Sequence, residues 1–532
     1  MPIRHAVVAL AALLAASGTG NAQRPAKPDA RLDRLKTEIA QEIDRMHDFS
    51  AQMVDMVFSF AELGFNEVET SKYLTTILER NGFTIERGSA GIPTAWVARW
   101  GSGRPVLALG SDIDGIPQAS QKPGVAYYDP IVTGAPGHGE GHNSGMPLNV
   151  TAAIALKKVM EREKLPGTLV LWPGVAEEQL GTKAYFVRAG VFKDVDVAMF
   201  THVGRNMQTG WGLQGFYNAL LSAEFAFRGT AAHSAGAPWR GRSALDAVEL
   251  MNTGWNFRRE HLRTEQRSHY VIKDGGDQPN VVPTTARVWY FFRETDYPKV
   301  MEMFETAKQM AQGAALMTGT TLDRVTVLGS AWVPYFNKPV AEAMYANIKR
   351  VGLPKWSAED QTLAKAVQRL LNRPERGLDT VVSPLGGPIP EDARRGGGSD
   401  DIGDVSWAVP TVQLNFPSNI PDLPGHHWSD AIAMATPIAH KGVTAGAKVQ
   451  AMTVLDLLLT PTLVSSARDY FAAQSKETKY TPFITAQDQP AIWLHADIMS
   501  KYRDQMRPFY FDTAKHKTYL EQLGVKYPTT RP

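Results

Sequence analysis

The 532-residue sequence contains no cysteine, and this absence bears on both redox chemistry and metal binding. Because disulfides persist in oxidising compartments, such a compartment would neither stabilise this chain through disulfides nor threaten it with mispaired ones. A metal site would have to be built from histidine, aspartate and glutamate.

An excess of one charge and long hydrophobic runs are also missing. The 56 Lys and Arg residues nearly balance the 54 Asp and Glu residues, and no long basic stripe or aromatic-studded basic patch stands out. The composition therefore argues against nucleic acid as a partner. A hydrophobic content of 43% over this length indicates a globular protein of about two or three domains.

The first residues have the composition of a signal peptide. Arg4 precedes an apolar run over residues 6–16, and Gly20 and Ala22 fit the −3 and −1 positions of a signal-peptidase site. The run is about half as long as a membrane-spanning helix needs to be. We therefore predict a signal peptide over residues 1–22, cleavage after Ala22, no stable membrane span, and a periplasmic or secreted mature protein.

Two kinds of pattern alternate along the mature chain. Apolar runs that end in polar loops, such as PVLALGSDIDGIP, TLVLWPGVAEE and VDVAMFTHVG, predict an α/β fold with a mostly parallel central sheet and helices on both faces. Residues 217–330 instead follow a β-α-β-β-α-β succession, which predicts an inserted α+β sandwich. The predicted organisation is an α/β domain in two parts, 23–216 and 331–455, and a C-terminal extension over 456–532 without a readable chemical signal.

Side chains that can bind metals collect in the loops at the predicted strand ends. In GHGEGHNSG, His138, Glu140 and His142 stand at alternate positions, so an extended or looped chain could turn them toward one point. Further candidates lie in other loops of this kind: Asp112, Asp114, Glu177, Glu178, His202, His426 and His427. Ligands bind beyond the carboxyl ends of the strands in such sheets. Convergence there would exceed the four ligands of one zinc ion and would favour two metals.

The adjacent Glu177 and Glu178 follow an apolar strand directly. Neighbouring side chains on an extended chain point opposite ways, so one could bind metal while the other faces the substrate as a general base. A pair of surface charges is the alternative interpretation of this motif.

Several longer stretches resemble one known family in their sequence and their order. They are SFAELGFNEVETSKYL, SDIDGIPQASQ, GHGEGHNSG, PGVAEEQLGTKA, FRGTAAHSA, PNVVPTTARVWYFFR, GGGSDDIGDVSW and PGHHWSD. The chain is similar to the clan MH zinc metallopeptidases of the aminoacylase and carboxypeptidase group, and within them to aminobenzoyl-glutamate hydrolase and related amidohydrolases. The resemblance implies a catalytic α/β domain interrupted by a domain for dimerisation and lid closure, and hence a homodimer.

The resemblance also implies roles for individual residues. The metal ligands would be Glu140, His142, Glu178, His202 and His426. His426 is preferred to His427 because the ligand of the family follows Pro-Gly directly. Glu177 would deprotonate the attacking water. His233 corresponds to a histidine that steadies the developing oxyanion, often across the dimer, and Asn280 would contact the substrate.

Four further residues have less specific assignments. Arg293 follows an apolar strand and could bind a substrate carboxylate through two hydrogen bonds, with a surface salt bridge as the alternative. Asp114 is expected to orient a metal ligand, and His138 to lie beside the ligands without binding metal. Asp401 lies in the family motif GSDDIGD near the site, where a turn is the alternative explanation.

One position departs from the family. The branch ordinarily has GHxCGHN, with a cysteine ligand, where this sequence has Glu140. A carboxylate remains an anionic donor, and other branches of the clan bridge their two metals with one, so we predict that Glu140 is a bridge. Without the softer thiolate, manganese or cobalt should compete better with zinc. The expected cofactors are two divalent ions, zinc or manganese, with cobalt as a further candidate.

The expected function is metal-dependent hydrolysis of the amide bond of an N-acyl or N-aroyl amino acid or a small dipeptide-like substrate. Glu177 would pass the proton it takes from water to the leaving amine, while His233 stabilises the oxyanion. One alternative is a periplasmic binding or scaffold protein that lost its chemistry when cysteine became Glu140. Another is a serine hydrolase using Ser144, although GHNSG is not the G-x-S-x-G nucleophile motif.

Overall fold

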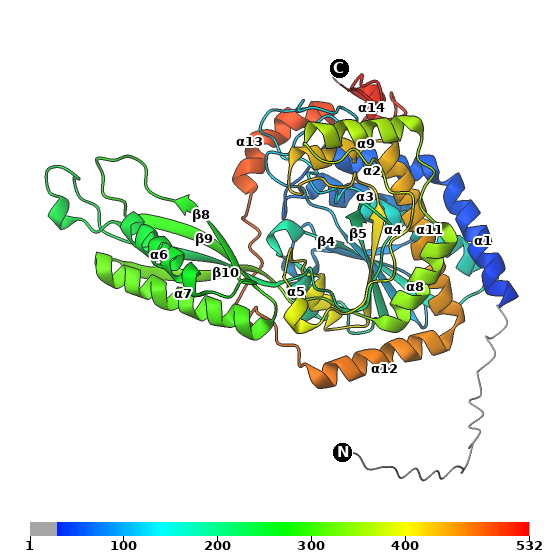
Figure 1. Ribbon diagram of the computed structural model, residues 1–532, viewed down its shortest axis with the longest axis horizontal. Helices are drawn as coiled ribbons and strands as arrows, with labels where there is room; N and C mark the ends of the chain where they lie inside the picture. Colours follow the sequence, from blue (N-terminus) through cyan, green and yellow to red (C-terminus); the bar gives the residue numbers. More distant parts are fainter. Residues whose placement is uncertain (1–28, 531–532) are drawn as a thin grey trace, which may run out of the picture.

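The computed structural model describes residues 29–530, which form a large α/β domain and a smaller domain that projects from it (Figure 1). The predicted signal peptide over residues 1–22 lies outside the described residues.

The central sheet has six strands in the order β1-β2-β4-β3-β5-β12. Their bounds are β1 Thr84–Arg87, β2 Trp96–Ser102, β3 Val106–Asp112, β4 Gly167–Gly174, β5 Val197–Gly204 and β12 Thr411–Pro417. The four strands from β4 to β12 are parallel, whereas β1 and β2 pair in antiparallel fashion at one edge. Every residue of β3 is buried, as expected for a strand covered on both faces. The prediction of a mostly parallel sheet is confirmed.

Helices cover both faces of this sheet because the chain reverses direction within it. It moves from β3 to β4 on one side and then returns past β3 to β5, so right-handed crossovers place α4 and α5 on opposite faces. The helices of this domain are α1 Ala30–Arg45, α2 His47–Phe60, α3 Val68–Arg80, α4 Gly145–Glu163, α5 Lys183–Ala189, α8 Lys338–Val351, α9 Ala358–Leu370, α10 Ile402–Ser406 and α11 Pro437–Leu459.

Helix α11 is the one described helix that is long and apolar enough to cross a membrane by length and composition. However, 83% of its apolar stretch is buried inside the protein. It packs against α1, α4 and α8, so its hydrophobicity is explained by its place in the core.

The projecting domain contains a four-stranded antiparallel sheet in the order β10-β7-β9-β8. Its elements are β7 Ala219–Arg228, α6 Ala244–Arg258, β8 Arg267–Asp274, β9 Thr285–Glu294, α7 Tyr297–Thr318 and β10 Thr321–Ala331, the predicted β-α-β-β-α-β succession. Alternate residues of β9 are buried; among them Phe292 packs on Trp255 of α6 and Phe304 of α7. The other face of β9, with Trp289, Phe291 and Arg293, is turned toward the α/β domain.

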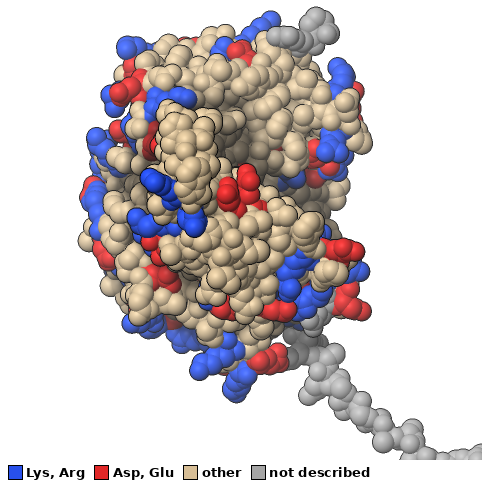
Figure 2. Space-filling model, turned by 90° about the vertical axis from the view of Figure 1, so that its left-hand side faces the viewer, with Lys and Arg blue, Asp and Glu red and all other residues tan. Residues whose placement is uncertain are grey.

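This domain exposes large apolar side chains, notably Phe257, Leu316 and Met317 on its helices and Val271 and Ile272 on the edge strand β8. Figure 2 views the molecule from the end where the domain projects and shows wide areas without charged side chains on this face. Large exposed apolar side chains that lie together are common at protein contacts.

The C-terminal extension is ordered and contains α12 Pro461–Glu477, α13 Ala496–Met506 and α14 Tyr519–Gln522. Between α12 and α13 the chain runs past the junction of the two domains (Figure 1). There Trp332 donates a hydrogen bond from its indole nitrogen to the carbonyl oxygen of Thr481, and Phe483 packs on Tyr297 with ring centroids 4.6 Å apart.

Helix α13 is fixed to the α/β domain by a buried ion pair between Arg503 and Glu62. Glu62 is fully buried, and its carboxylate also accepts hydrogen bonds from the backbone N–H groups of Glu69 and Thr70. Arg503 additionally donates to the carbonyl oxygen of Asn66 at 2.8 Å.

Removing this arginine should therefore be costly. Arg503→Met leaves the carboxylate of Glu62 buried without its cation, so we expect the free energy of unfolding to fall by about 3–5 kcal/mol. Urea titration followed by circular dichroism measures this. The double variant Arg503→Met, Glu62→Gln removes both charges and should recover most of the loss. Wild-type stability of the single variant would contradict this role of the pair.

Candidate metal centre

The predicted ligands come from loops that follow neighbouring parallel strands. Glu140 and His142 lie in the bent loop before α4, Glu178 lies in a short turn after β4, His202 lies near the end of β5, and His426 lies in the loop after β12. Because these strands are adjacent and parallel, their carboxyl ends meet at one edge of the sheet. The sheet topology is what brings the side chains together.

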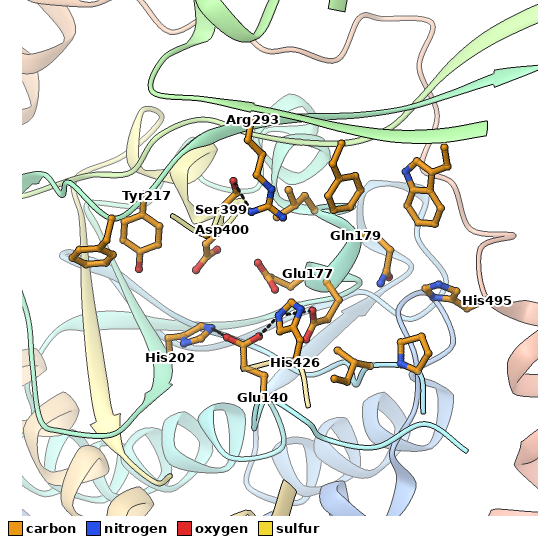
Figure 3. Close-up of a pocket in the computed structure, with 18 of the residues that line it drawn as sticks. Glu140, Glu177, Gln179, His202, Tyr217, Arg293, Ser399, Asp400, His426 and His495 are labelled. Carbon is orange, nitrogen blue, oxygen red and sulfur yellow. Dashed lines mark hydrogen bonds and ion pairs between the residues drawn. The ribbon is translucent and has the colours of Figure 1, made fainter. Parts of the chain in front are cut away.

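The carboxylate of Glu140 lies among three imidazoles. Its oxygens are 3.1 Å from Nε2 of His426 and 3.6 Å from Nε2 of His202 (Figure 3). Nε2 of His142 is also 3.6 Å away. The two Nε2 atoms of His142 and His202 are 3.3 Å apart, and Oε2 of Glu178 is 3.3 Å from Nε2 of His426. All five predicted ligands therefore converge.

This donor set fits divalent metal ions. Ligand atoms of Glu140, His142, Glu177 and Glu178 lie within 4.8 Å of one another. Oε1 of Glu178 is buried without a hydrogen-bond partner, so it has lone pairs that nothing in the described residues satisfies. Imidazole and carboxylate donors without thiolate suit zinc and manganese.

The pKa shifts within the cluster also fit a site for divalent metal ions. The hydrogen bond to Glu140, followed by the charge of Glu178, raises the pKa of His426 to about 9. Burial raises the pKa of Glu178 to about 8. Burial would also raise the pKa of Glu140, but the hydrogen bond with His426 and the charges of the other imidazoles hold it well below its usual range. A cation entering the cluster displaces protons from His426 and Glu178, so its affinity should rise with pH.

Glu177 lies next to this cluster, but its local conformation differs from the prediction. The expectation of an extended chain is wrong: Glu177 and Glu178 occupy a 3₁₀ turn between Ala176 and Leu180, whose φ angles are 51° and 55°. Such left-handed residues are strained and concentrate at functional sites. The turn still separates the pair, because Glu178 contacts His426 whereas Glu177 does not.

Oε2 of Glu177 is 3.9 Å from Nε2 of His142. On the other side, ligand atoms of Glu177, Asp112 and Asp400 lie within 4.8 Å of one another. Burial, together with the charges of Asp112 and Asp400, raises the pKa of Glu177 well above its usual value. The raised pKa means that this carboxyl group holds a proton more readily than an exposed glutamate does.

A buried lysine that sequence reasoning missed holds these acids in place. Lys183 is fully buried, and its Nζ lies 2.7 Å from Asp112, 3.2 Å from Asp400, and in contact with Asp401. Asp401 also accepts the backbone N–H of Lys183, so it fixes the start of α5. A lysine in QLGTKA has the appearance of a surface residue, and its place five residues after Glu178 is a weak signal.

Asp114 and His138 were both expected to lie beside the metal ligands, and the structure gives them different contacts. Asp114 contacts Nδ1 of His142 at 3.3 Å and accepts the backbone N–H of Glu178, so it orients two ligands. His138 turns away: its Nε2 contacts the carbonyl oxygen of Val57 at 3.1 Å, and burial lowers its pKa to about 3. The loop bends at residues 139–140, so the three side chains of GHGEGHNSG do not share one side, contrary to the prediction.

Two predicted residues of the projecting domain lie together but away from the cavity of their own chain. His233 and Asn280 are exposed, and the N–H of Ser234 donates to the carbonyl oxygen of Asn280 at 3.1 Å. Nδ1 of His233 accepts two backbone N–H groups, those of Ala235 and Gly236, so the proton of the neutral ring is on the exposed Nε2.

Two alternatives from the sequence lose support. His427 contacts the hydroxyl of Ser429 at 2.8 Å and does not line the cavity, whereas His426 does. Ser144 is fully buried and donates its hydroxyl to the carbonyl oxygen of Gly141 at 2.7 Å, so it is not placed as a nucleophile.

The cluster forms one wall of a cavity of about 770 Å³ between the two domains. Arg293 enters from β9, donates to the hydroxyl of Ser399 at 3.3 Å, and has a buried Nε without a hydrogen-bond partner. Figure 3 shows it above Glu177. The cavity also includes Tyr217, Asp400, Gln179 and His495, which were not predicted. Gln179 follows the glutamate pair and Asp400 precedes Asp401, but nothing in the sequence marks His495.

Comparisons with known proteins agree with this architecture. The family model M20_dimer, described as a peptidase dimerisation domain, matches residues 218–315. The chain is 34% identical to one of the subunits of p-aminobenzoyl-glutamate hydrolase of Escherichia coli (strain K12), over 78% of this chain and 90% of that protein. It is 27% identical to Xaa-Arg dipeptidase of Mus musculus, over 86% and 97%. The structure of an aminobenzoyl-glutamate utilization protein from Klebsiella pneumoniae has the same fold, with a TM-score of 0.51 and 18% identity over 80% of this chain and 98% of that one.

Substitutions of Glu140 test whether this cluster binds metal. Glu140→Ala removes the carboxylate that contacts all three imidazoles, so metal affinity measured by calorimetric titration with Zn²⁺ or Mn²⁺ should fall at least about 100-fold. Glu140→Cys, which supplies another anionic donor, should bind Zn²⁺ more tightly than the alanine variant. Unchanged affinity in Glu140→Ala would show that Glu140 is not a ligand.

Proposed function

Because this chain belongs to the family of p-aminobenzoyl-glutamate hydrolase, among the M20 peptidases, we propose that it is a metal-dependent amidohydrolase that cleaves N-acyl or N-aroyl amino acids or small dipeptide-like molecules. The observation that carries this proposal is the convergence of Glu140, three imidazoles and Glu178 beside the protonatable Glu177 at one wall of a cavity.

The residues Glu140, His142, Glu178, His202 and His426 would hold two divalent ions, zinc or manganese, with cobalt as a further candidate and Glu140 between them. Such ions polarise a carbonyl group and lower the pKa of water. Glu140 is an anionic donor, as a cysteine thiolate is. Glutamate in place of the family's cysteine therefore leaves the charge of the donor set unchanged. This favours an enzyme over a binding protein that lost its chemistry.

Glu177 would act as the general base and then as the general acid. Its raised pKa makes it a stronger base than an exposed glutamate, which supports a role in taking a proton from water and returning it to the leaving amine. Lys183 contributes indirectly, because its contacts with Asp112 and Asp400 keep these carboxylates beside Glu177.

Arg293 would bind the carboxylate of the substrate. Its guanidinium faces the cavity, and burial lowers its pKa without removing its charge. The unpartnered Nε shares one edge of the guanidinium with Nη2, and this edge can form the two parallel hydrogen bonds that an arginine makes to a carboxylate, while Nη1 donates to Ser399. This explains a preference for amino acids with a free carboxyl group.

The active unit would be a homodimer formed through the projecting domain. Its outer side exposes Phe257, Leu316 and Met317, and it matches a peptidase dimerisation domain. In a dimer, the exposed Nε2–H of His233 and the side chain of Asn280 would reach the cavity of the partner, where His233 could donate to the developing oxyanion. We also propose that the protein is exported to the periplasm or secreted after removal of residues 1–22.

The base assignment predicts the behaviour of Glu177→Gln. The amide cannot accept a proton from water, so kcat on an N-acyl amino acid should fall about 10²–10⁴-fold. Metal content, measured by mass spectrometry, should remain that of the wild type, because Glu177 is not assigned as a ligand. Turnover close to the wild-type value would reject Glu177 as the base.

The dimer assignment predicts complementation between two inactive variants. A heterodimer of His233→Ala and Glu177→Gln chains, purified through two different tags, has one site with an intact Glu177 and an intact His233 from the partner. Its activity should be about half that of the wild type. The wild-type and Glu177→Gln heterodimer is the matched control with one active site. A heterodimer as inactive as its parents would place His233 in the site of its own chain, and a fully active His233→Ala homodimer would place it outside the reaction.

A further inference from the structure

The C-terminal extension contributes a residue to the cavity that neither the sequence nor the proposed mechanism accounts for. His495, the residue before α13, lines the cavity together with Gln179 (Figure 3). Figure 3 shows both toward one end, whereas Tyr217 lies toward the other. The extension is therefore part of the wall that a substrate meets.

His495 is held in an unusual state. Its backbone is left-handed, with φ 63°, a conformation that costs energy for a residue with a Cβ and that concentrates at ligand sites. Its Nδ1 is buried and has no hydrogen-bond partner. Burial lowers the pKa of the ring, so the imidazole is neutral and offers one donor and one acceptor.

The chain on both sides of His495 contacts the α/β domain, and these contacts fix the position of His495. The carbonyl oxygen of Leu494 accepts a hydrogen bond from the side chain of Asn66 at 3.0 Å, and Arg503 forms the buried ion pair with Glu62. Strain at His495 is thus maintained by contacts elsewhere in the extension and does not relax.

The other walls of this end are apolar or aromatic. Trp289 and Phe291 enter from β9, and Ile116 and Pro117 from the loop after β3. The indole nitrogen of Trp289 is already used, donating to the hydroxyl of Ser222 at 2.7 Å. Flat aromatic groups are favoured between such walls.

Strand β9 sets the distance between the two ends of a substrate. Trp289, Phe291 and Arg293 alternate along its cavity face, so Trp289 lies about 13 Å along the strand from Arg293, at about 3.3 Å per residue. A substrate whose carboxylate meets Arg293 and whose amide lies at Glu177 would extend its acyl group toward Trp289 and His495.

From this arrangement we propose that His495, with Gln179, determines acyl specificity by hydrogen bonding to a polar substituent at the far end of an aromatic acyl group. This inference rests on the proposed amide hydrolysis. It assigns the C-terminal extension a function in substrate selection, because without this segment the aromatic walls would end in solvent.

The test compares N-benzoyl-L-glutamate with N-(4-hydroxybenzoyl)-L-glutamate. The wild type should prefer the hydroxylated substrate in kcat/KM by about tenfold, the effect of one hydrogen bond in a desolvated site. His495→Leu should abolish this preference, measured as the ratio of kcat/KM for the two substrates in the same variant. His495→Asn, whose side chain tolerates the left-handed backbone but is shorter, should also lose it. The exposed Trp493→Ala, on the same segment, is the control that should keep it.

Binding provides a second measurement that does not depend on turnover. In calorimetric titrations, the wild type should bind 4-hydroxybenzoate more tightly than benzoate, and the two His495 variants should bind both acids equally. If no N-acyl amino acid is hydrolysed, the proposed function fails, and these titrations still decide the role of His495. Equal discrimination in the wild type and both variants, in turnover or in binding, would overturn the inference.

Discussion

Acidic side chains buried next to one another must be neutralised, and the arrangement at the carboxyl edge of the sheet depends on this constraint. Asp112, Glu177, Glu178 and Asp400 are close together and poorly solvated, so their mutual repulsion would be costly without cations. The acids form two groups with different positively charged or metal-binding neighbours. Lys183 supplies one positive charge to the inner acids Asp112, Asp400 and Asp401, whereas the outer carboxylates face imidazoles in a geometry suited to divalent ions. Glu177 lies between the two groups, and burial together with the charges of Asp112 and Asp400 raises its pKa.

The remaining architecture places a substrate against this edge. Adjacent parallel strands supply ligands from separate loops, and β9 of the projecting domain covers them with Arg293 and two aromatic rings. The C-terminal extension runs past the junction of the domains and closes one end of the cavity with His495. The proposed ligands, Arg293 and His495 therefore come from three parts of the chain that are distant in sequence but meet at one cavity.

Much of this could be predicted from the sequence, for identifiable reasons. Short continuous apolar runs and their polar ends located the strands of the central sheet, and motifs such as GHGEGHNSG and PGHHWSD located the side chains that converge. Local geometry could not be predicted: the strained turn at Glu177 and the bend that turns His138 away depend on tertiary contacts. Lys183 was missed because burial of a lysine is set by three acids from distant segments. His495 was missed because a single histidine in a polar tail has no periodicity or motif.

The central claim is that the Glu140 carboxylate lies between two divalent ions held by His142, Glu178, His202 and His426. Anomalous diffraction from crystals grown with Zn²⁺ or Mn²⁺ tests it most directly, because it locates the ions independently of activity. The account predicts two peaks per chain, on either side of the Glu140 carboxylate and each within bonding distance of one of its oxygens. A single peak, or two peaks with Glu140 bound to neither, would contradict it.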